Sequence, residues 1–164
     1  MKIGLLSDTH SFLDPKVFEY FKDVDEIWHA GDVGDVKIIE ELQKFKPTIG
    51  VYGNIDTQDV KYYFPEFLRI EREGVSILLT HIAGKPGKYS KPLIDELKKN
   101  GVPKVLVCGH SHILLIKFDP RFQMLWLNPG ACGNHGFHSV KTLLRFELNK
   151  GNVENMEIIE IKKR

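Results

Sequence analysis

The chain opens on a short apolar run that leads into two side chains of metal-ligand type, Ile3-Gly4-Leu5-Leu6-Ser7-Asp8-Thr9-His10. A run of this length without helical periodicity, followed at once by polar residues, indicates a buried β-strand. In open α/β sheets, ligands gather beyond the carboxyl ends of the strands. The segment therefore predicts a buried strand with a functional position at its carboxyl end.

Four more apolar runs end in the same way. Residues 26–31 precede Asp32, 48–53 precede Asn54, 76–80 precede His81, and 105–109 precede His110 and His112. One such coincidence would mean little, but five of them point to a single edge of a sheet. We expect that edge to carry two aspartates, one asparagine and four histidines, which predicts a metal site.

The remaining pattern predicts strands and helices that alternate at the front of the chain and hairpins at the back. Strands are expected at 2–7, 25–30, 48–52, 104–108, 113–118, 122–127, 140–147 and 153–161, helices at 14–22, 35–45 and 90–100, and a hairpin at 65–80. Alternation favours parallel pairing and hairpins favour antiparallel pairing. We therefore expect an α/β (α+β) fold of two mixed β-sheets packed face to face and flanked by helices. A single sheet with helices on both faces is the alternative.

Length and composition predict one domain over residues 1–164. The chain is 42% hydrophobic and 27% charged, which suffices for a substantial core. Its 23 Lys and Arg against 22 Asp and Glu give a formal charge of +1, which argues against a surface for binding nucleic acid. Two cysteines, Cys108 and Cys132, do not make a disulfide framework. The first apolar run is too short for a signal peptide or a membrane span, so we expect a cytoplasmic protein.

The ligand types favour transition metals. Asp8 and His10, like His110 and His112, stand two residues apart, so in an extended segment each pair points to one side. Imidazole with carboxylate suits manganese, zinc, iron, cobalt or nickel better than magnesium or calcium. Seven candidates exceed what one ion with open positions can use, so two ions that share a ligand fit better. Asp32, in a sharp turn after Gly31, is the natural bridging carboxylate.

These motifs resemble, in their order, those of the calcineurin-like metallophosphoesterases. The matching segments are Asp8-Thr9-His10, Gly31-Asp32-Val33-Gly34-Asp35, Gly53-Asn54-Ile55-Asp56, His81, Gly109-His110-Ser111-His112 and Asn128-Pro129-Gly130. In length and spacing the chain is similar to the small bacterial and archaeal phosphodiesterase branch, which is related to the phosphoesterase-like subunit of retromer. The resemblance implies a four-layer αββα sandwich. It also implies one metal held by Asp8, His10, Asp32 and His112, and another held by Asp32, Asn54, His81 and His110.

One departure from the family pattern bears on the substrate. Many family phosphatases carry His where this chain has Ile55, and that His assists the leaving group or the transition state. Isoleucine can do neither. The resemblance thus implies a phosphodiesterase for a small diester, acting by in-line attack of a metal-bridging hydroxide, with Asp32, Asn54 and His81 as catalytic residues. Its cofactors would be two divalent ions, manganese first, with nickel, zinc, iron or cobalt as alternatives. A phosphomonoesterase is the alternative that differs only in substrate.

The other histidines have simpler explanations. His29 lies inside a predicted strand and is interpreted as a packed residue. Asn134-His135 resembles the family's missing Asn–His pair but follows a loop, so we interpret it as a coincidence. His138, in the Gly-rich loop at 128–138, is a candidate for contacting a substrate phosphate.

A protein of a different class remains as a competitor. The retromer subunit keeps this fold but serves mainly in protein assembly. Retention of His10 favours the enzyme, because the scaffold subunits tend to lose that ligand. An exposed apolar patch away from the strand ends would favour the scaffold. A homo-oligomer is left open.

Overall fold

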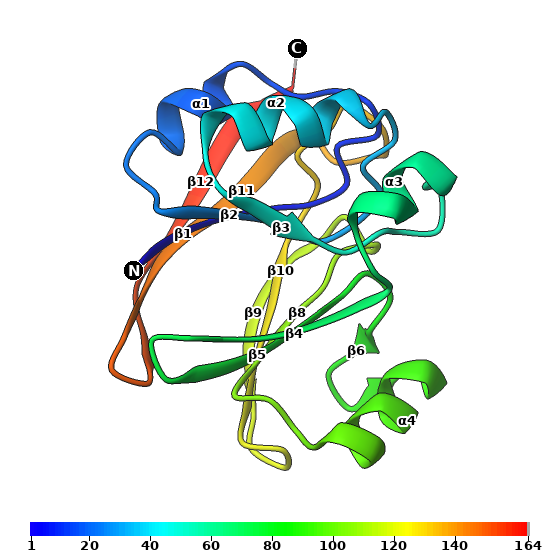
Figure 1. Ribbon diagram of the computed structural model, residues 1–164, viewed down its shortest axis with the longest axis vertical. Coiled ribbons are helices and arrows are strands. Elements are labelled where there is room, and N and C mark those ends of the chain that lie inside the picture. Colours follow the sequence, from blue (N-terminus) through cyan, green and yellow to red (C-terminus); the bar gives the residue numbers. More distant parts are fainter. Residues whose placement is uncertain (164) are drawn as a thin grey trace.

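The computed structural model describes residues 1–163 and shows two five-stranded sheets packed face to face (Figure 1). The first sheet has the order β12 (Asn152–Lys162), β11 (Val140–Asn149), β1 (Lys2–Leu6), β2 (Glu26–His29), β3 (Thr48–Gly50). Within it, β1, β2 and β3 run parallel, whereas β11 is antiparallel to both β1 and β12. The sheet is therefore mixed, as predicted.

The second sheet repeats this plan. Its order is β4 (Phe67–Arg72), β5 (Val75–Thr80), β8 (Val105–Val107), β10 (Met124–Pro129), β9 (Leu114–Asp119). The central strands β5, β8 and β10 are parallel, and β4 and β9 are antiparallel edge strands. A small two-stranded hairpin, β6 (Gly84–Lys85) and β7 (Lys88–Tyr89), stands apart from both sheets.

Helices cover the two outer faces, which gives four layers. Helices α1 (Lys16–Tyr20) and α2 (Lys37–Phe45) lie over the first sheet, and α4 (Lys91–Asn100) lies beneath the second (Figure 1). Three apolar clusters correspond to the three interfaces between layers: Phe21 and Ile39 belong to the first, Trp28 and Val107 to the second, and Leu93 and Trp126 to the third. The αββα sandwich is confirmed, and the single-sheet alternative is wrong. That residues 1–164 act as one domain stays a prediction, and Arg164 lies outside the described residues.

The helices differ from the prediction in their boundaries and in their number. The first helix is shorter than the expected 14–22, and it ends at Tyr20. The carboxylate of Asp14 accepts the backbone N–H of Lys16 at 3.1 Å, just before the helix begins. A short helix, α3 (Gln58–Tyr63), was not predicted. It has only one buried side chain, Val60, so its sequence carries no apolar stripe that would reveal it.

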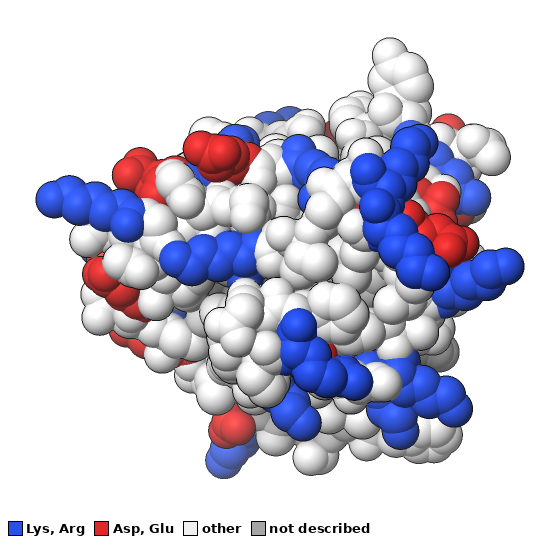
Figure 2. All heavy atoms as spheres, turned by 90° about the horizontal axis from the view of Figure 1, so that it is seen from below, with Lys and Arg blue, Asp and Glu red and all other residues white. Residues whose placement is uncertain are grey.

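Charge is distributed unevenly over the molecule. Between Gly84 and Arg121 the chain has eight Lys and Arg but three Asp and Glu. The view from below shows basic side chains in excess on that face (Figure 2). The net charge of the whole chain therefore conceals a local basic excess. Among the described residues, no helix is long and apolar enough to span a membrane.

Candidate metal centre

The structure brings the predicted ligands together, but from two sheets rather than from one edge. Asp8, Asp32 and Asn54 follow β1, β2 and β3 in the first sheet. His81 and the His110–His112 segment follow β5 and β8 in the second. Facing sheets lie about 10 Å apart, so side chains from both can meet between them. The expectation of a single edge was wrong because parallel runs alone do not show to which sheet each strand belongs.

Four of the ligand candidates form a first group. Asp8, His10, Asp32 and His112 each offer one N or O atom within 4.8 Å of the others. His112 Nε2 lies 3.2 Å from Asp8 Oδ1, and His10 Nε2 lies 3.6 Å from Asp32 Oδ2. Both aspartates are buried, whereas the two histidines are only partly so. The group thus opens to solvent on its histidine side.

A second group shares Asp32 with the first. It joins Asp32 to His81 and His110 within the same 4.8 Å limit. His81 Nε2 lies 3.2 Å from Asp32 Oδ1. Asn54 adjoins this group, because its Oδ1 lies 2.9 Å from His110 Nδ1. The two groups coincide with the two ligand sets that the family resemblance implies.

Two buried atoms at the centre lack hydrogen-bond partners among residues 1–163. They are Asp8 Oδ1 and His81 Nε2, which lie 4.0 Å apart; the atoms 3.2 Å from them, His112 Nε2 and Asp32 Oδ1, are not aligned for a hydrogen bond. A buried polar atom without a partner costs about 1–3 kcal/mol, so native proteins rarely leave one without a reason. Each of the two atoms has another member of the ligand groups as a close neighbour. A divalent cation fits this donor set.

The tautomer of His81 is fixed by its other ring nitrogen. Nδ1 lies 2.7 Å from the carbonyl oxygen of Ala30, which can only accept, so Nδ1 carries a proton. Nε2 of the neutral ring therefore presents a lone pair to the centre, as a metal-binding imidazole does. Burial acts to lower the pKa of His81, but the carboxylates of Asp32 and Asp8 outweigh it and raise the pKa. The site thus attracts positive charge to this nitrogen.

Asp32 is held in its charged form. Burial acts to raise its pKa, but His81, the backbone N–H of Ile55 at 3.1 Å and His10 outweigh that effect, so the pKa lies below its ordinary value. Gly53 passes so close to Asp32 that a Cβ at this position would overlap the carboxylate. The close approach is possible only for glycine, and it lets the loop after β3 present Asn54 to the centre.

Five of the seven ligand candidates have left-handed backbone conformations. The φ angles are 54° at Asp8, 46° at His10, 53° at Asp32, 69° at His110 and 58° at His112. This region is uncommon for residues other than glycine, and such residues cluster at functional sites. Backbone hydrogen bonds hold the conformation: the N–H of Asp8 donates to Gly31 O at 2.9 Å, and that of His10 to Asp32 O at 3.0 Å. The loops after β1 and β2 thus fix each other.

Two side chains that the sequence analysis named only as members of family motifs organise these loops. Asp56 is buried, and its carboxylate accepts the backbone N–H groups of Gly34 at 2.8 Å and Gly53 at 2.7 Å. Asn128 donates to Gly109 O at 2.8 Å and to Ser111 Oγ at 3.1 Å. Asp56 therefore ties the second and third strand ends together, and Asn128 holds the loop that carries His110 and His112.

The Gly-rich loop brings two more histidines to the centre. The ring of His135 lies 4.6 Å from that of His10, centroid to centroid, and the side chain is exposed. The sequence analysis did not assign it a role, because it does not follow a strand. The ring of His138 lies 5.8 Å from that of His112, but its Nε2 is 3.0 Å from Gly133 O and its Nδ1 is buried. This arrangement does not favour a contact between His138 and a substrate phosphate, and that role stays a prediction.

His29 is a packed residue, as interpreted from the sequence. It is fully buried, its Nε2 lies 3.0 Å from Thr9 Oγ1, and its Nδ1 accepts the backbone N–H of Gly31 at 3.1 Å. Burial lowers its pKa to about 3, so the ring is neutral. It supports the loop that carries Asp32. Cys108 and Cys132 are both buried, and burial raises the pKa of the Cys132 thiol to about 12, so it is not activated.

Sequence comparison agrees with this geometry. The sequence model of the calcineurin-like phosphoesterase superfamily domain matches residues 1–151. The chain belongs to this superfamily. It is 33% identical to a probable metallophosphoesterase of Methanocaldococcus jannaschii, in a match that covers 80% of this chain and 68% of that protein. It is 28% identical to a phosphodiesterase of the same organism, over 80% of this chain and 84% of that one.

Structural comparison supports the fold of this phosphoesterase domain. A crystal structure of Vps29 from Entamoeba histolytica superposes with a TM-score of 0.74 at 16% identity. The match covers 99% of this chain and 100% of Vps29. At this identity the likeness concerns the fold alone. The chain is thus a phosphoesterase-superfamily domain with a candidate metal-binding site of aspartates and histidines.

Proposed function

We propose that this chain is a phosphodiesterase that depends on two divalent transition-metal ions, manganese first. The observation that carries the proposal is the pair of ligand groups that share Asp32. When bound, two such ions lower the pKa of a water molecule, polarise the phosphoryl oxygens and stabilise both the attacking and the leaving oxygen. The two buried free cysteines are compatible with a reducing, cytoplasmic setting, which is part of the proposal.

The positions of Asp32, His81 and Asn54 support a different role for each of them. Asp32, buried between the groups and held by the Ile55 amide, would bind both ions. His81 would bind through Nε2, because its Nδ1 is protonated and donates a hydrogen bond to Ala30 O. Asn54 lies at the exposed side of its group, beside His110, where a substrate oxygen could also arrive. These positions support catalytic roles for Asp32, Asn54 and His81.

Ile55 supports a preference for diesters over monoesters. Its side chain is 43% exposed next to Asn54, and it offers neither a proton donor nor a cation. A monoester dianion brings more negative charge to the site, and a poor leaving alkoxide benefits from a proton donor. General acid catalysis contributes about 10²–10⁴-fold, so its absence at this position matters most where the leaving group is poor.

Metal analysis with a matched control tests the proposal. Asp32→Ala should lower the metal content of both positions, whereas Asn54→Ala should mainly lower one. Asp35→Ala serves as the control, because Asp35 is exposed and accepts the backbone N–H of Lys37 outside both groups. Elemental analysis after reconstitution with manganese measures these contents. Less than one ion in the unmodified chain, or near-normal content in Asp32→Ala, would contradict the dinuclear arrangement.

Paired substrates test the reaction. A diester should be hydrolysed faster than a monoester with the same phenol leaving group. The activity should be lost in chelator and restored by added metal. Ile55→His should raise monoesterase activity with alkyl leaving groups more than diesterase activity with an activated phenol. A preference of the unmodified chain for monoesters would count against the diester assignment.

One observation favours a second candidate function, that of an interaction protein. The edge strand β9 leaves Ile116 37% exposed and Phe118 51% exposed, and Ile113 just before it is 66% exposed. Exposed apolar side chains on a sheet edge are typical of contact surfaces between proteins, including copies of one chain. Light scattering of the unmodified chain and of Phe118→Lys tests this candidate: a change in mass would favour it, and a monomer in both cases would not.

A further inference from the structure

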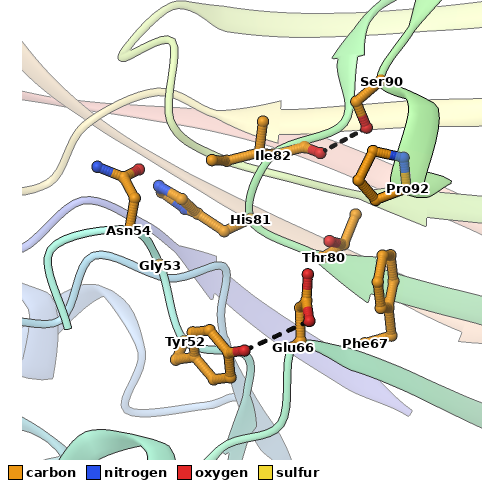
Figure 3. A pocket seen from close by; sticks show the side chains of 10 residues that line it. All are labelled: Tyr52, Gly53, Asn54, Glu66, Phe67, Thr80, His81, Ile82, Ser90 and Pro92. Atoms are coloured by element: carbon orange, nitrogen blue, oxygen red, sulfur yellow. Dashed lines mark hydrogen bonds between the residues drawn. The ribbon is translucent and has the colours of Figure 1, made fainter. Parts of the chain in front are cut away.

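A cavity of about 280 Å³ opens directly beside the metal centre (Figure 3). Asn54 and His81 form its end toward the centre, and the start of α4 closes the opposite end. The residues between them come from three elements that are distant in sequence: the loop after β3, the start of β4 and the end of β5. Any group that fills this cavity therefore touches two of the proposed ligands.

The walls of the cavity are mainly apolar. Figure 3 shows the rings of Tyr52, Phe67 and Pro92 around the space, with Ile82 above it. A cavity of about 150 Å³ lined by aliphatic and aromatic side chains admits benzene. The present cavity is larger, so it has room for one ring or two fused rings. Cavities of this kind bind small molecules through apolar contact, and a few polar groups fix the orientation.

The charge on the walls is negative. Glu66 is the charged side chain among the described residues that line the cavity, and Tyr52 Oη donates to its Oε2 at 3.4 Å. Lys61 stacks on the ring of Tyr52, 5.0 Å from its centroid, but does not line the cavity. A carboxylate at the wall repels an anionic group and accepts a hydrogen bond from an N–H or O–H of a neutral one.

We propose that this cavity binds one arm of the phosphodiester substrate and that this arm is an uncharged ring system. The inference rests on the proposed function, because the phosphate would lie at Asn54 and His81 while the ring fills the cavity. The substrate class is then a diester with at least one neutral aromatic or heterocyclic arm. Diesters whose arms are both small alkyl groups, or whose ring carries a negative charge, fit less well.

Binding of hydrolysis-resistant diester mimics to the manganese-loaded protein tests the inference without turnover. Methyl(phenyl)phosphinate and dimethylphosphinate carry the same single negative charge, contain no P–O–C ester bond that could be hydrolysed, and differ only in one arm. Burial of a phenyl ring should make the phenyl compound bind about 10-fold more tightly in calorimetry. (4-Carboxyphenyl)methylphosphinate should bind about fivefold more weakly than the phenyl compound, because its charge meets Glu66. Equal binding of the phenyl and methyl compounds, or binding of neither, overturns the inference.

Variants assign the effect to this cavity. Phe67→Ala and Ile82→Ala should each reduce the preference for the phenyl compound at least threefold, and Glu66→Gln should remove the penalty on the carboxyphenyl compound. Phe122→Ala is the matched control, because Phe122 and Phe67 pack partly buried on the same apolar cluster, but Phe122 does not line the cavity. Thermal melting shows whether each variant is folded. If Phe122→Ala changes the preference as much as Phe67→Ala does, the assignment is wrong.

The two proposals fail in different ways. A preference for the phenyl arm in binding, together with no hydrolysis of any diester, supports the cavity assignment and refutes the proposed function. Hydrolysis of diesters without a preference for a ring refutes the cavity assignment and leaves the proposed function standing.

Discussion

Asp8→Asn should make the metal-free protein more stable and the metal-loaded protein relatively less stable. Asp8 is fully buried, and its Oδ2 accepts the backbone N–H of His110 at 3.2 Å, but its Oδ1 has no hydrogen-bond partner within residues 1–163. Without metal, the chain thus buries a carboxylate with one oxygen unsatisfied. An amide at the same position loses the charge, keeps the acceptor and offers an N–H group 3.2 Å from His112 Nε2.

The magnitude follows from the unsatisfied oxygen. Leaving one buried polar atom without a partner costs about 1–3 kcal/mol, so its relief should stabilise the chelator-treated protein by about 1–2 kcal/mol. For a domain of this size that corresponds to a rise in Tm of roughly 3–6 °C. Metal at about 100 times its Kd should stabilise the unmodified chain by about 2.7 kcal/mol. Asp8→Asn should gain much less, because a neutral amide is a weaker ligand.

Thermal and urea unfolding of both proteins, in chelator and in manganese at pH 8, measure the predicted reversal. Asp35→Asn is the matched control, since Asp35 is exposed and outside both ligand groups. Its stability should not respond differently to metal from that of the unmodified chain. The reasoning is refuted if Asp8→Asn is less stable than the unmodified chain in chelator while it gains as much from metal.

Three further changes have defined outcomes. Asp56→Ala should lower the free energy of unfolding by about 2–4 kcal/mol in urea, because a buried and a partly buried backbone N–H group lose their charged acceptor; a loss below 0.5 kcal/mol would contradict the role of Asp56 in joining the two loops. Burial acts to raise the pKa of Asp14, but Lys141, at 2.7 Å, outweighs it and lowers the pKa. The pair therefore stabilises above the ordinary Asp pKa of about 4, and the stability gap between the unmodified chain and Asp14→Asn should close as the pH falls below that value; a gap that is constant with pH would refute this. His135→Ala should reduce diester hydrolysis at least fivefold whereas Phe137→Ala, in the same exposed loop, should not, and equal effects would show that only loop structure is involved.

The sequence predicted the strand ends because they are local features. Each apolar run stops where its strand leaves the core, and the next polar residue marks the site, as with Asp8 after β1 or His81 after β5. The hairpin around Gly74 and the helix end at Gly101 were also predictable, because glycine is the residue that favours a turn or a helix end. Both glycines have the positive φ angles that these positions require. The placement of the ligand candidates at strand ends follows from these local signals, but their division between two facing sheets does not.

The parts that were not predicted depend on contacts between distant segments. The hairpin of β6 and β7 has only two residues in each strand, which is too short to show a period of two. His135 reaches His10 because the Gly-rich loop folds back over the centre, which no local pattern reveals. The roles of Asp56 and Asn128 lie in bonds to backbone groups of other loops. Such acceptor and donor roles leave no spacing signal in the sequence.

Strain and unsatisfied atoms coincide at the same residues, and this bears on why they are there. Glycine would adopt the left-handed backbone of Asp8, His10, Asp32, His110 and His112 without the steric cost that these residues bear. A purely structural turn would therefore gain stability from glycine at each position. Asp8 also buries an unsatisfied oxygen, which packing alone would not favour. Both costs are understandable if the side chains serve a cation that the loops are shaped to hold, because binding then returns the stability that the empty arrangement forgoes. The pairs Asp8–His10 and His110–His112 therefore reach the centre on left-handed turns rather than on the extended backbone that their spacing suggested.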